Sequence, residues 1–254
     1  MVMGEENVLN CGAGEGSMLG IIGGSGFYSM GRMRGKSVRT EYGKAHVYGG
    51  KVGGSEFLFV PRHGREHKVP PHMVNYRANV RALQKEGATA LLTFHASGII
   101  SKYGPGDIVA VEDFIGFQSP ATFWDSFAGG VRHADVSAPF DKGMGEVVRE
   151  VASAHKIKIR EGGIVATTRG PRFETKAEVR ALGVLGANLV NMTLGYEAAL
   201  ANEAEIPLCS LAIGTNYACG VKKSPLSEKE VFKVMKGVEE KLKGLAVYAA
   251  KRVP

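Results

Sequence analysis

Three side chains that could bind a polar ligand follow short apolar runs in the second half of the chain, namely Glu174, Thr193 and Asn216. Apolar runs bounded by Gly, Pro or polar residues are typical of buried strands. In open α/β sheets, ligands bind beyond the carboxyl ends of such strands. We therefore expect a carboxylate, a hydroxyl and an amide to face one pocket.

Two segments in the first half of the chain could bind an anion. Gly-Gly-Ser-Gly at 23–26 follows an apolar run, and its glycines let successive backbone N–H groups turn toward one point, with Ser25 as a further donor. A plain tight turn is the alternative. The segment 61–67 is Pro-Arg-His-Gly-Arg-Glu-His, and the arginine fork suits a phosphate or a carboxylate. Metal binding competes for its histidines, but the sequence has no HxH, HExxH or CxxC pattern, so we predict no metal site.

Two more histidines are candidates. His95 opens the segment His-Ala-Ser-Gly, which we predict to be a turn after a strand at 88–94, and a core histidine bonded to the backbone is the alternative. His133 lies in a long stretch at 115–139 that is rich in aromatic, small and polar residues. Loops of that length are typical of lids or contact surfaces, so His133 could reach a site, including that of a neighbouring subunit. An exposed histidine without function is the alternative.

The elements that must position these residues alternate between strands and helices. Strands are predicted at 19–22, 57–60, 88–94, 108–111, 164–168, 188–190 and 208–213, and helices at 72–85, 141–155, 174–185, 196–204 and 227–251. Residues 1–18 are polar, Gly-rich and without periodicity, which predicts a flexible N-terminal extension. No linker divides residues 19–254, so we predict one α/β domain there.

Composition excludes several classes of protein. The 254 residues are 44% hydrophobic and 22% charged, as in ordinary globular domains, and the length suffices for one large α/β domain. No apolar run approaches a membrane span and residues 1–18 lack the order of a signal peptide, so we expect a cytoplasmic protein without membrane contact. The net charge of +7 suits anionic partners, but the basic residues are scattered without an aromatic stripe, so we expect no nucleic-acid binding.

Taken together, the motifs resemble those of trimeric purine nucleoside phosphorylases. In chain order they are Gly-Gly-Ser-Gly at 23–26, Pro-Arg-His-Gly-Arg-Glu-His at 61–67, His-Ala-Ser-Gly at 95–98, Gly-Pro-Arg-Phe-Glu-Thr at 170–175, Asn-Met-Thr at 191–193 and Thr-Asn-Tyr at 215–217. The similarity to the methylthioadenosine phosphorylase branch covers Leu19 to about Lys251. It implies a single-domain three-layer α/β/α fold with a mixed central sheet flanked by helices, assembled as a homotrimer or as a dimer of trimers. It also implies phosphorolysis of a purine nucleoside in purine salvage, without a cofactor and with inorganic phosphate as co-substrate.

The resemblance also assigns roles to residues. The phosphate would be bound by residues from four of the motifs: Ser25 and adjacent amides, Arg62, His63, the backbone near His95 and Ala96, and Thr193. Met192 would lie under the ribose, Phe173 would pack on the base, and Glu174, Asn216 and Ala218 would surround the base edge. His133 and Leu226 would meet the 5′ substituent. His95 is a departure, because the family more often has Thr or Asn there.

Two further departures bear on the base. Enzymes specific for methylthioadenosine carry Ser after Gly-Pro-Arg-Phe and an Asp-x-Asp pair at 216–218, whereas this chain has Glu174, Asn216 and Ala218. A Glu174 carboxylate can accept from N1–H of hypoxanthine or guanine, and the Asn216 amide can bond both O6 and a protonated N7. We therefore predict Glu174 and Asn216 as the catalytic residues of a 6-oxopurine nucleoside phosphorylase. Inosine and guanosine are the expected substrates, with 5′-methylthioinosine as a third candidate.

Adenine has no N1–H and would leave Glu174 unpaired, a mismatch that can cost about 10⁴-fold in discrimination. A helix-start carboxylate and a turn residue are the structural alternatives for Glu174 and Asn216. A methylthioadenosine phosphorylase with an unusual base site is the alternative within the family. A protein that binds nucleosides or RNA without catalysis is the alternative from another class.

Overall fold

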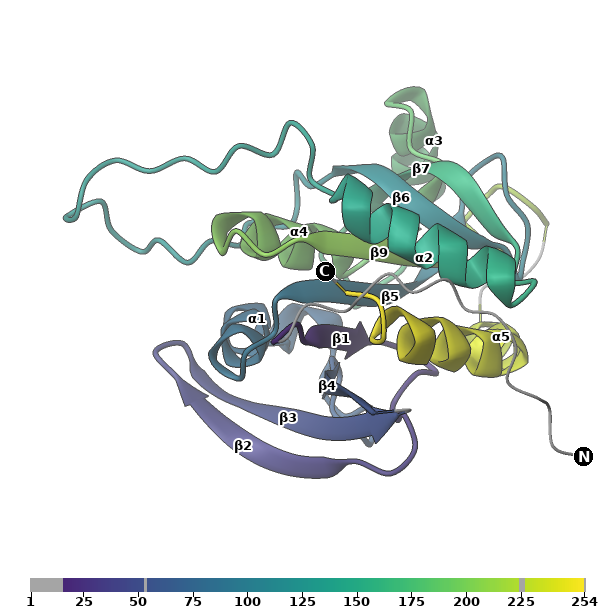
Figure 1. Cartoon of the computed structure of the whole chain (residues 1–254). Helices are drawn as coiled ribbons and strands as arrows, with labels where there is room; N and C mark the ends of the chain where they lie inside the picture. Colours follow the sequence, from purple (N-terminus) through teal and green to yellow (C-terminus); the bar gives the residue numbers. More distant parts are fainter. Residues whose placement is uncertain (1–15, 53, 224–226, 254) are drawn as a thin grey trace, which may run out of the picture.

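The computed structural model describes residues 16–52, 54–223 and 227–253. Within these ranges, nine strands form one sheet (Figure 1). The strands are β1 (Leu19–Gly23), β2 (Arg34–Thr40), β3 (Gly43–Val52), β4 (Ser55–Pro61), β5 (Ala90–Ile99), β6 (Ile108–Ile115), β7 (Ile159–Thr167), β8 (Leu189–Asn191) and β9 (Leu208–Tyr217). The helices are α1 (Tyr76–Lys85), α2 (Lys142–Ala154), α3 (Lys176–Val184), α4 (Leu194–Glu203) and α5 (Glu228–Ala249), and a single 3₁₀ turn, η1, spans Pro71–Met73.

The sheet is mixed and partly closed. Its strand order is β2-β3-β4-β1-β5-β8-β7-β6-β9, and β5 also pairs with β9. Strand β1 is parallel to β4 and β5, while β5 is parallel to β9 and antiparallel to β8. The double pairing of β5 makes β5, β8, β7, β6 and β9 a closed ring, with β1, β4, β3 and β2 continuing from it. The carboxyl ends of β1, β4 and β5, which carry three of the motifs, therefore lie side by side.

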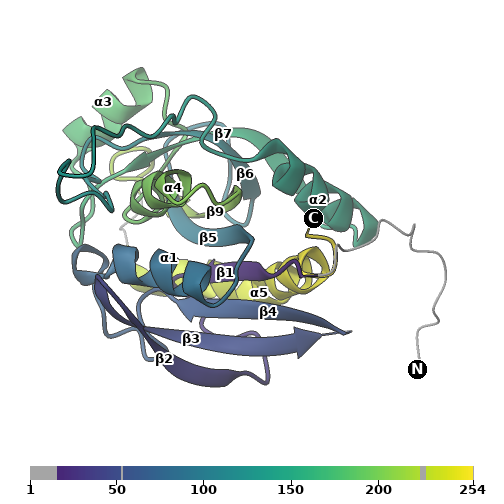
Figure 2. The same cartoon turned by 60° about the vertical axis from the view of Figure 1, so that its left-hand side comes forward.

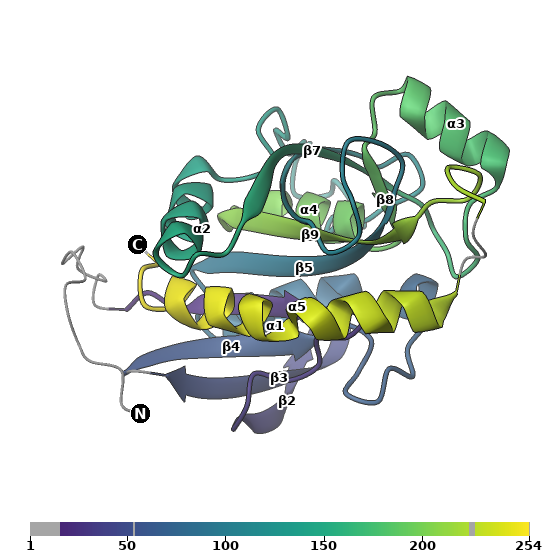
Figure 3. The ribbon, with the colours of Figure 1, turned by 90° about the vertical axis from the view of Figure 1, so that its right-hand side faces the viewer.

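Helices cover both faces of the sheet. Figure 3 shows α5 and α2 in front of the sheet, with α1 and α4 behind it. On the α5 side, apolar residues at helical spacing, such as Met235, Val238 and Leu242, pack on strand residues of β1, β4 and β9. On the other side, α1 and α4 contribute Val80, Leu83 and other residues to a second core. The expected three-layer α/β/α architecture with a mixed central sheet is thus confirmed.

Several boundaries differ from the sequence prediction. Residues 95–98 were expected to form a turn but lie inside β5, which runs to Ile99 because both β8 and β9 pair with its last residues. For the same reason Asn216 lies within β9 and does not follow it. The hairpin of β2 and β3 was not predicted. Most of β2 is exposed, so it has no apolar run that would mark it as a strand.

Two parts of the chain project from the layers. Helix α3 stands apart from the other helices at one end of the sheet (Figure 2). The segment 116–141 between β6 and α2 forms the long loop that extends to the left in Figure 1. It exposes apolar side chains, with Val131 74% and Phe127 49% accessible.

The N-terminal extension predicted at 1–18 lies mostly outside the described residues. Its last residue, Met18, is bonded to Thr89: the Met18 N–H donates to the Thr89 hydroxyl, and the Met18 C=O accepts from the Thr89 N–H. In the described part of the chain, every helix is too short or too polar to cross a membrane.

Candidate functional site

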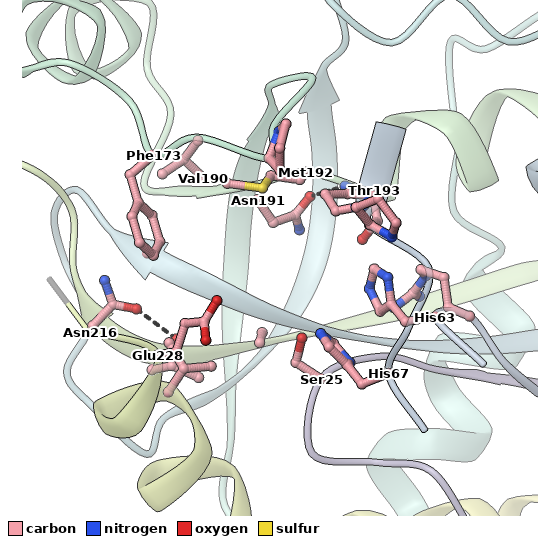
Figure 4. Close-up of a pocket in the computed structure, with 18 of the residues that line it drawn as sticks. Ser25, His63, His67, Phe173, Val190, Asn191, Met192, Thr193, Asn216 and Glu228 are labelled. Atoms are coloured by element: carbon pink, nitrogen blue, oxygen red, sulfur yellow. Dashed lines mark hydrogen bonds between the residues drawn. The ribbon is translucent and has the colours of Figure 1, made fainter. Parts of the chain in front are cut away.

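One cavity of about 520 Å³ lies beyond the ends of β1, β4 and β8 and is completed by the start of α5 (Figure 4). The predicted site residues that line it come from six segments of the chain: Ser25, Arg62, His63, Ala96, Phe173, Glu174, Met192, Thr193, Asn216 and Ala218. In Figure 4, Phe173 and Asn216 lie at one end of the cavity and Ser25 and His63 lie at the other, with Met192 between them. The structure thus brings a carboxylate and an amide to one end and a guanidinium to the other.

Glu174 lies at the first end of the cavity. It directly precedes Thr175, which is the N-cap residue of α3. Thr175 and Glu178 form a capping box, and Arg172 turns outward to bond Glu178, so Glu174 is left free to face inward. The Glu174 side chain is 7% exposed, and its Oε1 accepts from the Thr168 hydroxyl at 2.6 Å. Its second oxygen is available to a ligand.

Asn216 is aimed by an irregularity in the β5–β9 pairing. Ser97 is opposite Gly214 and Gly98 is opposite Asn216, so Thr215 is an extra residue on β9. The Thr215 hydroxyl donates to Asn216 Oδ1 at 2.9 Å, and Asn216 Nδ2 donates to the Tyr217 carbonyl at 3.2 Å. One N–H and one lone pair of the amide remain for a ligand.

Arg62 is the centre of the opposite end. Its Nε and Nη2 donate to the two carboxylate oxygens of Glu197 at 2.5 and 2.7 Å, and its Nη1 donates to the Phe94 carbonyl at 3.1 Å. Any side chain at Gly24 would collide with this guanidinium, which explains a glycine there. Of the five guanidinium N–H groups, two remain for an anion.

The ion pair of Arg62 and Glu197 is removed from water, with both side chains 1% exposed. Burial raises the pKa of Glu197, and the two hydrogen bonds from Arg62 oppose that effect. Because the bidentate geometry needs two accepting oxygens, Glu197 is ionised in this pair.

His63 is a neutral imidazole. Its Nδ1 lies 2.8 Å from the Val69 carbonyl and must donate to it, which leaves Nε2 as the nitrogen available to a ligand. Burial, and secondarily the charge of Arg62, lowers the pKa of His63 to about 3.

Thr193 is the N-cap residue of α4 but does not cap the helix with its hydroxyl. Asn191 Oδ1 accepts from the backbone N–H groups of Thr193 and Leu194, both at 3.1 Å, so the Thr193 hydroxyl is left for other partners. One of these is His95, whose Nδ1 lies 2.8 Å from Thr193 Oγ1.

The imidazole of His95 does not line the cavity. It is 1% exposed and lies behind Thr193, with Nε2 2.9 Å from the Thr93 hydroxyl. The ring points into the core because β5 continues through this residue, so the predicted phosphate contact near His95 could come only from the backbone, and it stays a prediction. Its neighbour Ala96 reaches the cavity.

The two residues predicted at the 5′ substituent are not both described. Leu226 lies outside the described residues. His133 does not line the main cavity of its own chain but borders a second one on the long loop, together with Phe127, Arg132 and Glu203. A contribution of His133 to a neighbouring copy's site stays a prediction.

Sequence reasoning missed Glu197 and Glu228, and it noted His67 within the segment 61–67 without giving it a role. Glu197 supports Arg62, while His67 and Glu228 line the cavity. The Tyr28 hydroxyl lies 2.8 Å from His67 Nδ1. Glu197 could have been noticed as a carboxylate in the otherwise apolar first part of α4, residues 194–201, because a carboxylate is costly to bury unless it is paired.

Comparison with known proteins identifies the family of the chain. Residues 18–251 match the family described as "Phosphorylase superfamily". A protein of Moorella thermoacetica named "Probable 6-oxopurine nucleoside phosphorylase" is 40% identical over 242 residues, 93% of each chain. One of Methanopyrus kandleri named "Probable S-methyl-5'-thioinosine phosphorylase" is 38% identical over 227 residues, 88% of each chain.

Among solved structures, the methylthioadenosine phosphorylase of Schistosoma mansoni in complex with adenine superimposes with a TM-score of 0.86. It is 29% identical, and the alignment covers 92% of this chain and 90% of that one. Since the family match spans every motif and every strand and helix of the sheet layers, the chain belongs to the phosphorylase superfamily.

Proposed function

We propose that this protein is a purine nucleoside phosphorylase that cleaves 6-oxopurine nucleosides, inosine and guanosine first, into free base and pentose 1-phosphate. The observation that carries the proposal is that a carboxylate, Glu174, and an amide, Asn216, line the same cavity. Relatives named for 6-oxopurine substrates support it.

The hydrogen-bonding groups of this end match a 6-oxopurine. Glu174 has one oxygen bonded to Thr168 and one left to accept N1–H of the base. Asn216 has one N–H left to donate to O6 and one lone pair left to accept from N7–H. Adenine reverses the donor and acceptor pattern at both N1 and position 6, so it would face Glu174 with a lone pair.

The reaction needs no protein nucleophile. A phosphate oxygen forms the new bond to C1′ of the ribose as the bond from C1′ to N9 breaks, and the electron pair of that bond leaves with the purine. The leaving purine takes up a proton from solvent water at N7, and the Asn216 carbonyl oxygen would accept a hydrogen bond from the resulting N–H. At the other end, Arg62 and Thr193 would hold the phosphate beside the sugar and Met192 would support the sugar face.

The test is base release from four nucleosides in the presence and absence of phosphate. Inosine and guanosine should turn over faster than methylthioadenosine, and 5′-methylthioinosine reports on the 5′ position. Faster turnover of methylthioadenosine than of inosine refutes the base assignment and favours the alternative within the family. Absence of phosphate-dependent cleavage for all four would leave a nucleoside or RNA binder without catalysis, whose RNA affinity should fall steeply with salt.

We also propose assembly as a homotrimer or a dimer of trimers, with the loop 116–141 as part of the contact. Phe127, Val131 and Val136 are 49%, 74% and 43% exposed on it, which is unusual for an isolated protomer. His133 on the same loop would then approach the cavity of the neighbour. Light scattering should give a trimeric or hexameric mass for the wild type and a smaller mass for Phe127→Ser. A monomeric wild type with full activity would contradict this assembly.

A further inference from the structure

A line of buried hydroxyls and one histidine lies behind the end of the cavity that contains Arg62, His63 and Thr193, where phosphate is proposed to bind. We call it the phosphate end. Ser210 Oγ lies 2.7 Å from Thr93 Oγ1, Thr93 Oγ1 lies 2.9 Å from His95 Nε2, and His95 Nδ1 lies 2.8 Å from Thr193 Oγ1. Thr93, His95 and Ser210 are at most 1% exposed, and Thr193 alone of the four lines the cavity. The line therefore ends on a hydroxyl that faces a ligand.

The protons on this line have only two consistent arrangements. Each hydroxyl has one proton, and burial together with the charge of Arg62 lowers the pKa of His95 well below its usual value, so the ring is neutral with one N–H. If Nε2 carries the proton, it donates to Thr93, and Thr193 must donate to Nδ1. If Nδ1 carries the proton, it donates to Thr193, and the proton of Thr193 is free to point into the cavity.

The chemistry of phosphate selects between the two arrangements. At neutral pH the HPO₄²⁻ ion has one P–OH proton and three oxygens that only accept. His63 cannot donate from Nε2 because its single proton is held on Nδ1 by the Val69 carbonyl, so His63 needs the P–OH as its donor. The oxygen that meets Thr193 is then a pure acceptor, and Thr193 has to donate to it.

Among the described residues, Glu197 is the carboxylate near His95 that favours the other arrangement. Its Oε2 lies 3.6 Å from His95 Nε2, which is beyond hydrogen-bonding distance, and both of its oxygens already accept from Arg62. Thr93, at 2.9 Å, is the direct partner of Nε2 and can donate to it.

We propose that His95 is a positioning residue for the co-substrate: in the phosphate-bound protein it carries its proton on Nδ1, donates to Thr193, and so directs the Thr193 hydroxyl proton at a phosphate oxygen. Thr93 and Ser210 support this state by donating along the line toward Nε2. This inference rests on the proposed function, since it needs phosphate as the ligand beside Thr193.

The tautomer can be observed directly by ¹⁵N magic-angle-spinning NMR of protein labelled at histidine, with saturating inorganic phosphate. The two imidazole nitrogens of a neutral ring resonate far apart, and the His95→Asn spectrum identifies which signals belong to His95. We expect an Nδ1–H, Nε2-bare ring for His95 in the phosphate complex. An Nε2–H ring in that complex overturns the inference.

Kinetics of two variants give an independent readout. Asparagine can place an N–H near the position of Nδ1, whereas leucine cannot, so His95→Asn should keep the KM for phosphate within about threefold of wild type. His95→Leu should raise it about 10- to 100-fold, as expected for the loss of one directed hydrogen bond to a charged ligand, with the KM for inosine nearly unchanged. Equal phosphate KM values for the two variants, with both folded by circular dichroism, contradict the inference. Failure of the proposed function is distinct, because the wild type would then release no base in response to phosphate.

Discussion

Replacing Asn216 with aspartate tests whether the amide selects the base. The variant keeps the size of the side chain and exchanges an N–H donor for a second accepting oxygen. In the cavity this removes the donor that O6 of inosine is expected to need. It also removes the bond from Nδ2 to the Tyr217 carbonyl, which is 3.2 Å long.

The two losses act on different measurements. The loss at the Tyr217 carbonyl is present with every substrate and lowers the free energy of unfolding by about 1–3 kcal/mol, as for other unsatisfied buried acceptors. The loss at O6 acts only on 6-oxopurines. Because Asn216 is 4% exposed, water cannot replace the donor, and about 2–3 kcal/mol of transition-state binding should disappear. That energy corresponds to a fall of about 30- to 150-fold in kcat/KM for inosine.

Adenosine should gain little in the same variant. Its amino group could donate to the new carboxylate, but its N1 lone pair still faces Glu174. The inosine-to-adenosine ratio of kcat/KM should therefore fall mainly because the inosine value falls. The assay is base release at saturating phosphate, with kcat/KM measured for both nucleosides.

Asn79→Asp is the matched control, because this substitution makes the same chemical change on α1, at a residue that does not line the cavity. It should leave the ratio unchanged. If Asn216→Asp keeps the wild-type ratio within about threefold, the amide does not read the base, and the argument for 6-oxopurine preference fails at this residue.

Three other outcomes follow from the phosphate end of the cavity. Glu197→Ala should lower the free energy of unfolding, measured by urea titration, by about 3–5 kcal/mol because it leaves Arg62 charged and unpaired in the core. The double variant Arg62→Met with Glu197→Leu should recover most of that stability but bind phosphate poorly. His63 has a pKa of about 3 in the folded protein and about 6.5 in the unfolded chain, so between these values the unfolded state binds more protons and the free energy of unfolding decreases as the pH is lowered. Lowering the pH from 7 to 5 should therefore cost about 2 kcal/mol through this residue, and His63→Gln should remove that share of the pH dependence. The KM for phosphate should respond weakly to added potassium chloride, and a steep rise with salt would show that net charge, not directed hydrogen bonds, holds the anion.

Most of the fold could be predicted from the sequence because its layers are marked by simple patterns. Apolar runs ended by Gly or Pro identified the inner strands, and the helical spacing in the last segment identified α5. The β2–β3 hairpin escaped because an exposed edge hairpin needs no apolar run. The lengths of β5 and β9 were underestimated because pairing on both sides of β5 extends a strand through residues whose own preference is for a turn.

The cavity was predictable at the level of motifs but not of hydrogen-bond geometry. Glu174, Thr193 and Asn216 were expected to face one pocket, and they line one cavity. Their roles stay predictions. The sequence could not show that Glu197 would hold Arg62. The two residues are separated by 135 positions, and only the three-dimensional fold brings them together.

The charge of the phosphate end changes how the +7 net charge of the chain should be interpreted. An excess of basic residues predicts an anion site built on positive charge, yet Arg62 is neutralised by Glu197 and His63 is uncharged. A dianion in this place would have to be held by the direction of a few N–H and O–H groups. In such a site a single hydroxyl that points the wrong way presents a lone pair to the anion, so fixing the proton of Thr193 matters more than it would beside an unpaired arginine. That is a physical reason for a buried, fully hydrogen-bonded histidine at a position where no charge is needed.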